Sequence, residues 1–246
     1  MTPREECRCW LRGASSIAVL TGAGISAESG IPTFRSSSGE SALPPLWKKF
    51  RPEELATPAA FARDPVLVWR WYDWRRGLVA RAKPNAGHVA LAELERRGRR
   101  LTIVTQNVDG LHGLAGNRDV HEIHGSIWML RCTVCGNEWN SMETPLPHIP
   151  PACPCGGMAR PGVVWFGEGI PGPAWLAAET AAVTCGVLLV VGTSAVVYPA
   201  SSLVPIARSA GARIIEINLE DTAASNLVDH SLRARAGEAL PDLLGF

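Results

Sequence analysis

The sequence predicts an α/β fold in which a parallel sheet is covered by helices on both faces and a smaller second domain is inserted. Short β-branched apolar runs recur along the chain, and amphipathic helical segments lie between several of them. Two long stretches break this alternation, which predicts the second domain. A chain of 246 residues with 46% hydrophobic and 19% charged residues fits one large globular domain with a satellite.

The first expected strand, residues 17–20, is an apolar run that ends in a glycine turn and leads into a helix. Four further runs have the same character and complete the expected parallel sheet: 101–104, 163–166, 187–191 and 213–217. Helical patterns are found at 70–81, 86–97 and 174–183.

The alternation is interrupted at about residues 36–84 and again at about 127–160. The first interruption carries helical signals, and the second contains four of the seven cysteines with prolines between them. We therefore expect 1–35, 85–126 and 161–246 to form the sheet domain. The segments 36–84 and 127–160 together form the expected smaller domain.

Charge and cysteine content exclude several classes of protein. Twenty-four basic and 23 acidic residues leave a net charge of +1, so no bulk field draws the chain to nucleic acid or to a membrane. The arginine-rich run at 96–100 is interpreted as a solvated helix end. The polar start of the chain is not typical of a signal peptide, and paired cysteines suit metal binding in a reducing compartment. We expect a cytoplasmic monomer.

Gly22, Ala23 and Gly24 lie between the first strand and a helix, where backbone N–H groups can bind phosphate. This signal is weak alone, because Ala27 stands where a dehydrogenase has a third glycine and no acidic residue ends a second strand. The polar segment 26–35 instead predicts a lid over a ligand, with Arg35 reaching an anionic or ribose group.

Polar residues follow three of the expected strands: Gln106, Asn107 and Asp109; Gly192, Thr193 and Ser194; and Asn218, Leu219 and Glu220. Because ligands bind at the carboxyl ends of parallel strands, we expect these residues to contact one. For Asn218, a role in a turn is the alternative.

The cysteines form two close pairs separated by 17 residues, which predicts one structural zinc held by four thiolates: Cys132, Cys135, Cys153 and Cys155. The second pair is one residue shorter than the usual spacing. Free thiols or a nucleic-acid-binding ribbon are the alternatives, and the near-neutral charge disfavours the ribbon.

His124 is the candidate general base. It is followed by Gly125, which allows close approach of backbone or substrate, and a neutral imidazole can accept a ribose hydroxyl proton. A lone histidine is more often structural, which is the interpretation for His88, His112, His148 and His230, and with less force for His121.

Five motifs, in order, resemble the sirtuins, the NAD-dependent protein deacylases: residues 21–35, 105–109, 121–125, 163–168 and 191–194. The resemblance covers the chain from about residue 15 to its end. It implies a Rossmann-type domain with a smaller zinc-ribbon and helical domain. It further implies that the acyl group of a protein lysine is transferred to the ADP-ribose of NAD, with release of nicotinamide.

The resemblance implies catalytic roles for His124 and Asn107. It assigns NAD contacts to Gly22, Ala23, Gly24, Ser26, Ile31, Phe34, Arg35, Gln106, Asn107, Asp109, Gly192, Thr193, Ser194, Asn218, Leu219, Glu220 and Ala236. The acyl-lysine peptide would pair with the backbone of a segment that includes Val164, Phe166, Gly167 and Glu168, and would lie near Tyr198.

Tyr72 and Arg75 are three residues apart on an expected helix and therefore share one face. By themselves they suggest an aromatic core stripe with a surface arginine. In a sirtuin they resemble the Tyr-x-x-Arg of the desuccinylase class, where both side chains bind the distal carboxylate of a succinyl or malonyl group. Ala56 matches the small residue that widens the acyl pocket in that class. Succinyl and malonyl removal is therefore expected, with acetyl removal possible.

Two other functions are compatible with parts of the pattern. A nicotinamide-dependent dehydrogenase would use the same glycine turn but would not release nicotinamide. A non-catalytic module that binds acylated peptides would tolerate loss of His124.

Overall fold

The computed structural model describes residues 1–33 and 49–245. The chain divides into two compact units. The first comprises Met1–Ser29, Lys83–Ile123 and Pro171–Phe246, and the second comprises Gly30–Ala82 and His124–Ile170. Residues 161–170, which the sequence placed with the sheet domain, belong to the second unit by their contacts.

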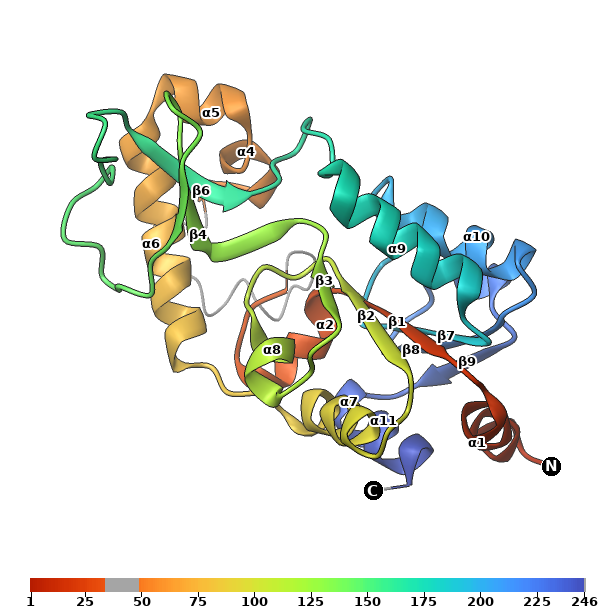
Figure 1. The fold of residues 1–246 in the computed structure, drawn as a ribbon. Helices are drawn as coiled ribbons and strands as arrows, with labels where there is room; N and C mark the ends of the chain where they lie inside the picture. Colours follow the sequence, from red (N-terminus) through yellow and green to blue (C-terminus); the bar gives the residue numbers. More distant parts are fainter. Residues whose placement is uncertain (34–48, 246) are drawn as a thin grey trace. The chain divides into compact units, whose positions relative to one another are not determined.

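The first unit is built on a six-stranded parallel sheet with the order β3-β2-β1-β7-β8-β9 (Figure 1). The strands are β1 (Ile17–Thr21), β2 (Leu101–Thr105), β3 (Val120–Glu122), β7 (Val187–Val191), β8 (Arg213–Asn218) and β9 (His230–Arg233). Every residue of β1 and β7 is buried, because both strands lie inside the sheet with helices on either face. The expected parallel sheet is thus confirmed.

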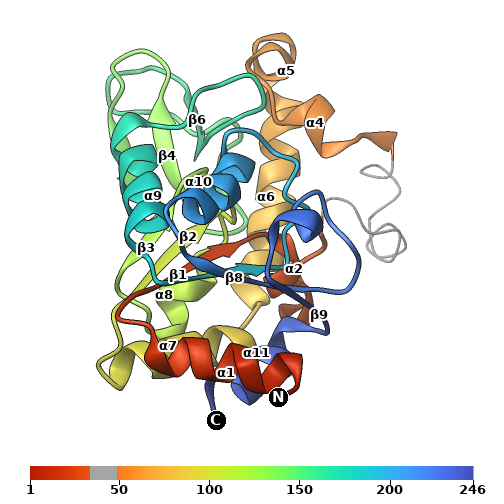
Figure 2. The ribbon, with the colours of Figure 1, turned by 90° about the vertical axis from the view of Figure 1, so that its right-hand side faces the viewer.

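Helices cover both faces of this sheet, and both views show α9 and α10 on one face and α1, α7 and α11 on the other (Figures 1 and 2). The longer helices are α1 (Pro3–Gly13), α7 (Ala86–Arg96), α9 (Gly172–Thr184), α10 (Leu203–Ser209) and α11 (Ala236–Leu244). Short elements are α2 (Ala23–Ser26), η1 (Ala27–Ser29), α8 (Leu111–Ala115), η3 (Ala200–Ser202) and η4 (Ser225–Leu227). Leu11, Leu91 and Leu240 pack with Val19 and Ile215 in the buried core.

The carboxyl ends of the central strands are in register. Thr21 of β1 is paired with Thr105 of β2 and with Val191 of β7, and Val191 is paired with Ile217 of β8. The chain runs from β1 toward β2 on one side and returns through β7 and β8 on the other, so the direction of strand order changes between β1 and β7. Ligands bind at such switch points in parallel sheets.

The described residues of the second unit form helices and a three-stranded antiparallel sheet of order β5-β4-β6 (Figure 1). Its elements are α4 (Pro52–Leu55), α5 (Pro58–Arg63), α6 (Pro65–Arg81), β4 (Gly125–Cys132), β5 (Glu138–Asn140) and β6 (Ala159–Val163). Helix α6 is joined to the sheet by Trp69, whose Nε1 donates to Ala159 O over 2.8 Å. Two turns later, Arg76 donates to Ile127 O over 2.8 Å.

The expected parallel strand at 163–166 is wrong. Strand β6 ends at Val163 and belongs to the antiparallel sheet, and residues 164–166 lie outside any strand. Of these residues only Trp165 is buried, and Phe166 is 42% exposed. Their N–H groups are bound outside a parallel sheet: Val164 donates to His124 O and Phe166 to Ala56 O, each over 2.9 Å. A short apolar run does not reveal which sheet it joins.

None of the helices in residues 1–33 and 49–245 combines the length and apolar character that a membrane span requires.

Candidate functional site

The turn after β1 packs directly on the turn after β7. Gly24 N–H donates to Gly192 O over 2.8 Å, and Gly22 N–H donates to Val191 O over 3.1 Å. A Cβ on Gly24 would lie 2.6 Å from Gly192 Cα, and Gly192 has a φ of +59°. Both glycines are therefore required by this backbone contact as well as by any phosphate. The following helix, α2, has only four residues, so its dipole is weaker than the sequence suggested.

Ser26, Asn107 and Asp109 form one buried hydrogen-bond network at the ends of β1 and β2. Ser26 Oγ donates to Asp109 Oδ2 over 2.8 Å, and Asn107 Nδ2 donates to Ser26 Oγ over 3.1 Å. Asn107 Nδ2 also donates to Gly22 O over 3.1 Å, and Asp109 Oδ1 accepts from Leu111 N–H over 2.9 Å. The amide and the carboxylate are thus held in place before any ligand binds.

A second network joins the ends of β2, β7 and β8. Gln106 Nε2 donates to Thr193 Oγ1 over 2.9 Å, and Asn218 Nδ2 donates to Thr193 O over 3.0 Å. Asn218 Oδ1 also accepts from Leu219 N–H over 2.9 Å, so Asn218 has the turn role that was its alternative interpretation. The structure therefore brings together the polar residues that follow these three strands.

Glu122 is a titratable residue of this region to which the sequence gave no role. Burial, and secondarily the charge of Asp109, raise the pKa of Glu122 to about 7. A carboxyl group that titrates near neutral pH can exchange a proton with a nearby group. In the sequence, the only indication of a role for Glu122 is its position close to His124 in the 121–125 motif.

Four of the histidines interpreted as structural have structural contacts. His230 stacks on Trp10, and its Nε2 lies 3.0 Å from Glu6 Oε2. His88 and His112 are buried with ring centroids 4.9 Å apart, and burial lowers the pKa of His88 to about 4 and of His112 to about 3. His121 pairs with Asp119 over 3.1 Å. His88 and His112 are therefore neutral at physiological pH.

His124 lies in the turn between β3 and β4, and its carbonyl accepts from Val164 N–H over 2.9 Å. The next residue, Gly125, has a φ of +75°, and a Cβ there would lie only 2.3 Å from Gly162 O. Glycine is thus required where β4 approaches β6, and this contact fixes the backbone that carries His124. The His124 side chain is half-buried, so part of it is open to solvent.

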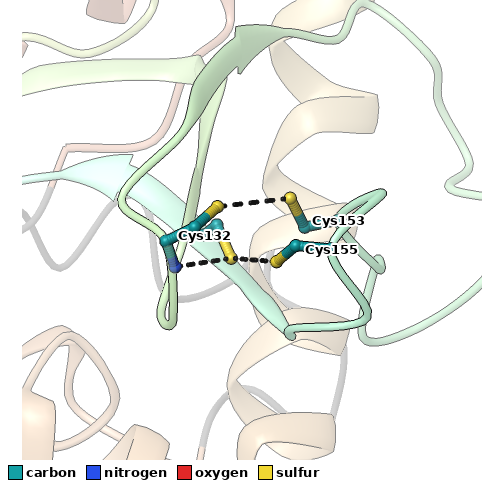
Figure 3. Close-up of side chains that lie close together, drawn as sticks. Cys132, Cys153 and Cys155 are labelled. Carbon is teal, nitrogen blue, oxygen red and sulfur yellow. Dashed lines mark hydrogen bonds between the residues drawn. The ribbon is translucent and has the colours of Figure 1, made fainter.

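The four paired cysteines form a cluster whose sulfur atoms lie within 4.8 Å of one another. Figure 3 shows Cys132, Cys153 and Cys155 of this cluster close together. Four sulfurs about 2.3 Å from a tetrahedral zinc are about 3.8 Å apart. The observed Cys132–Cys155 and Cys135–Cys153 sulfur separations are 3.5 Å and 3.7 Å, so the shorter second pair still fits one zinc. Hydrogen bonds from the N–H groups of Cys135 and Val134 lower the pKa of Cys132 to about 6, which favours a thiolate ligand.

The expected acyl-group determinants lie in the second unit. Phe166 N–H donates to Ala56 O over 2.9 Å, and Trp165 Nε1 donates to Tyr72 Oη over 3.0 Å. Tyr72 is buried, and burial raises the pKa of Tyr72 to about 12, so its hydroxyl stays protonated. Arg75 is half-buried, and its guanidinium lies over the Trp71 ring, 4.9 Å from the centroid.

The expected peptide-pairing segment has a side chain that is already engaged. Both carboxylate oxygens of Glu168 accept from Arg160, over 2.6 Å and 2.8 Å, and Glu168 Oε2 also accepts from Trp165 N–H over 2.9 Å. Gly167 has a φ of +88° and turns the chain between Trp165 and Glu168. Tyr198, on the first unit, is 81% exposed and therefore accessible to a partner.

The remaining expected NAD residues are distributed as follows. Ile31 and Ala236 are buried, Leu219 is 64% exposed, and Glu220 is exposed. Ala236 begins α11, whose N-terminal Gly237 N–H donates to Glu28 Oε2 over 2.8 Å. Ala23 starts α2, and Ser194 follows Thr193 in the turn after β7. Phe34 and Arg35 lie outside the described residues.

A family model for the Sir2 family matches residues 22–199, which include the Ser26–Asn107–Asp109 network, His124 and the cysteine cluster. The chain belongs to the Sir2 family. This agrees with the resemblance to sirtuins and confirms the expected Rossmann-type sheet with a smaller cysteine-containing unit.

Sir2 family members of known name and structure match nearly the whole chain. The "NAD-dependent protein deacylase 2" of Pyrobaculum aerophilum is 53% identical over 235 residues, which cover 95% of this chain and 92% of the relative. The crystal structure of a Sir2 homolog–NAD complex has a TM-score of 0.91 at 47% identity and covers 98% of this chain and 92% of its own. A Sir2–p53 peptide–NAD+ structure has a TM-score of 0.87 at 28% identity, covering 99% and 98%.

Proposed function

We propose that this chain is an NAD-dependent protein-lysine deacylase that removes succinyl and malonyl groups, and acetyl groups as well. Its products are nicotinamide, O-acyl-ADP-ribose and free lysine. The observation that carries the proposal is the buried Ser26–Asn107–Asp109 network, in a chain 53% identical to a protein named "NAD-dependent protein deacylase 2".

The strand-end residues suit NAD. Gly22, Gly24 and Gly192 keep side chains out of the turn between β1 and β7, where a Cβ would meet backbone. Both N–H groups of the Asn107 amide already donate, to Gly22 O and to Ser26 Oγ, so Asn107 presents its carbonyl oxygen and Asp109 its carboxylate in fixed positions. Two acceptors suit the NH2 group of the nicotinamide carboxamide. When bound, NAD supplies a ribose carbon that becomes electrophilic as nicotinamide leaves. The lid role of segment 26–35, including Phe34 and Arg35, is part of the same proposal.

His124 acts in this proposal as the general base that accepts a proton from a ribose hydroxyl. Its backbone is fixed by the Val164 hydrogen bond and by Gly125, and the residue as a whole is half-buried. An imidazole held in this way can take up a proton near neutral pH without moving the chain.

The acidic acyl group is bound by Tyr72 and Arg75 on one face of α6, with Ala56 leaving room for the longer chain. Tyr72 keeps its hydroxyl proton at any physiological pH, so it can donate to a carboxylate. Arg75 supplies a planar cation that matches a carboxylate. The peptide backbone pairs with the 164–168 segment, and Tyr198 contacts the peptide.

The cysteine cluster binds one structural zinc in this proposal. We further propose a cytoplasmic location, because the four thiols must stay reduced to hold the metal. A monomer that acts on protein lysines rather than on nucleic acid or membranes fits the net charge of +1.

The test incubates the protein with NAD and matched succinyl-, malonyl- and acetyl-lysine peptides, and quantifies nicotinamide and free lysine. Arg75→Met should lower kcat/KM for the acidic acyl groups by about 10- to 100-fold, the loss expected for a charge-assisted pair, and leave deacetylation nearly unchanged. Arg70→Met, an exposed arginine on the same helix, is the control. His124→Tyr should abolish turnover of all three peptides.

Two results would contradict the proposal. Absence of nicotinamide release would favour a dehydrogenase or a binding module, and turnover that survives His124→Tyr would remove the general base. Equal losses with acidic and acetyl peptides in Arg75→Met would overturn the acyl preference alone.

A further inference from the structure

Trp165 makes a buried hydrogen bond to the side chain that we assign to the acyl carboxylate. Its Nε1 lies 3.0 Å from Tyr72 Oη, and the two side chains are 3% and 4% exposed. An indole N–H can only donate, so the tyrosine oxygen is the acceptor. Among residues 1–33 and 49–245, no acceptor is found for the proton of the Tyr72 hydroxyl itself.

This geometry determines where the Tyr72 proton can point. A phenolic hydroxyl has one proton and two acceptor positions, and the Trp165 N–H occupies one of these positions. The Tyr72 proton turns away from Trp165, since two protons facing each other repel. A hydroxyl oriented in this way donates to a carboxylate without first having to reorient.

We propose that Trp165 is a positioning residue for acyl-group selection: its indole N–H orients the Tyr72 hydroxyl so that the hydroxyl donates to the distal carboxylate of the acyl chain. This inference rests on the proposed preference for acidic acyl groups. It adds to that proposal a residue that acts through Tyr72 rather than on the substrate.

Trp165 is itself held rigidly, as a positioning residue must be. The Arg160 guanidinium stacks on its ring, 3.6 Å from the centroid, and Phe61 packs at 5.2 Å. Glu168 binds that guanidinium through both oxygens and also accepts from Trp165 N–H over 2.9 Å. These contacts fix both the backbone and the ring of Trp165, so the direction of its N–H is set by Arg160 and Glu168.

The experiment measures KM and kcat for succinyl- and acetyl-lysine peptides in Trp165→Phe, which removes the N–H but keeps an aromatic ring. Losing this orientation should raise KM for the succinyl peptide about three- to tenfold, the usual effect of one hydrogen bond, and change the acetyl KM less than about twofold. Trp69→Phe is the matched control, because Trp69 is equally buried and its Nε1 donates to Ala159 O over 2.8 Å. Replacement of Trp165 by 3-benzothienylalanine, which has the same shape without the N–H, gives a second variant if the phenylalanine fails to fold.

A double-mutant cycle with Tyr72→Phe tests the route of the effect. If Trp165 acts through the Tyr72 hydroxyl, removing its N–H in a Tyr72→Phe background should change the succinyl KM by less than about twofold. A persisting effect in that background, equal losses for both peptides, or the same acyl shift in Trp69→Phe would overturn the inference. If the wild type turns over the succinyl peptide but the Trp165 variants keep the wild-type ratio of succinyl KM to acetyl KM, this inference alone is refuted. Absence of wild-type succinyl turnover refutes the proposed acyl preference and the inference with it.

Discussion

Glu216→Gln should destabilise the first unit strongly although it keeps the size of the side chain. Glu216 of β8 is fully buried and accepts hydrogen bonds from Thr222 Oγ1, Ser225 Oγ (2.7 Å), Ser231 Oγ (2.6 Å) and Arg233 Nη1 (3.0 Å). The carboxylate thereby joins β8, β9 and the loop after Asn218. A glutamine amide has one acceptor oxygen and presents its NH2 group to the remaining donors.

The magnitude follows from those four contacts. A hydrogen bond to a charged group contributes about 1.5–3 kcal/mol against about 0.5–1.5 kcal/mol for a neutral one, so four bonds lose about 4 kcal/mol or more together. Glutamine is easier to bury than a carboxylate, and Arg233 is 35% exposed and can be solvated, which offsets part of the loss. We expect the free energy of unfolding to fall by about 2–3 kcal/mol at neutral pH.

The pH dependence provides a second signature of the same network. Burial alone would raise the pKa of Glu216, but the hydrogen bonds from Ser231, Thr222, Ser225 and Arg233 outweigh it and lower the pKa below its usual 4.5. The ionised group therefore stabilises the fold fully above pH 4.5, and this stabilisation is lost as the pH falls through the folded-state pKa. The difference between wild type and Glu216→Gln should accordingly shrink below pH 4.5.

Urea unfolding followed by circular dichroism measures the free energy of unfolding at neutral pH and its change in acid. Glu238→Gln, on the exposed surface of α11, is the control for the same chemical change. KM for NAD should also rise, because the loop held by Glu216 begins with Leu219 and Glu220. A loss of less than about 1 kcal/mol at neutral pH, or a gap that does not narrow in acid, would refute the reasoning.

Two further outcomes are expected. Gly125→Ala should lower the melting temperature more than Gly136→Ala. Both residues have a positive φ, but only at position 125 would the new Cβ meet backbone, with Gly162 O at 2.3 Å. Equal shifts of the melting temperature in thermal unfolding would show that the positive φ alone causes the loss. Cys155→Ser should lower the zinc content below one atom per chain, whereas Cys9→Ser, outside the cluster, should keep one atom per chain. Inductively coupled plasma mass spectrometry measures the zinc content. One zinc atom per chain in Cys155→Ser would disprove a four-thiolate site.

The parallel sheet was predictable where its strands are buried on both faces. Strands β1 and β7 have uninterrupted apolar runs, and β8 has a run broken only by Glu216; each was found within a residue or two of its expected position. Strands β3 and β9 were missed because they are short and largely half-buried, so they carry no continuous apolar signal. The 163–166 run was assigned to the wrong sheet because its burial comes from side-chain contacts of Trp165, which periodicity does not report.

The meeting of separate polar motifs at one end of the sheet was predictable, but the contacts between them were not. Strand register explains why separate motifs meet, since Gly22, Gln106, Gly192 and Asn218 each lie at an aligned strand end. Sequence could not show that Gly24 packs on Gly192, because the constraint comes from a residue 168 positions away. Nor could it identify Glu122 or Trp165, whose importance depends on burial and on neighbours distant in sequence.

The contacts described for Tyr72 and Trp165 lie within the second unit, whereas the Ser26–Asn107–Asp109 network lies within the first. The residues that we propose to select the acyl group can therefore change without altering the hydrogen bonds of the Ser26–Asn107–Asp109 network. Arg75→Met and Trp165→Phe should accordingly leave KM for NAD unchanged when it is measured with the acetyl peptide. A large rise in that KM would mean that acyl selection and NAD binding are coupled through a path other than these two networks.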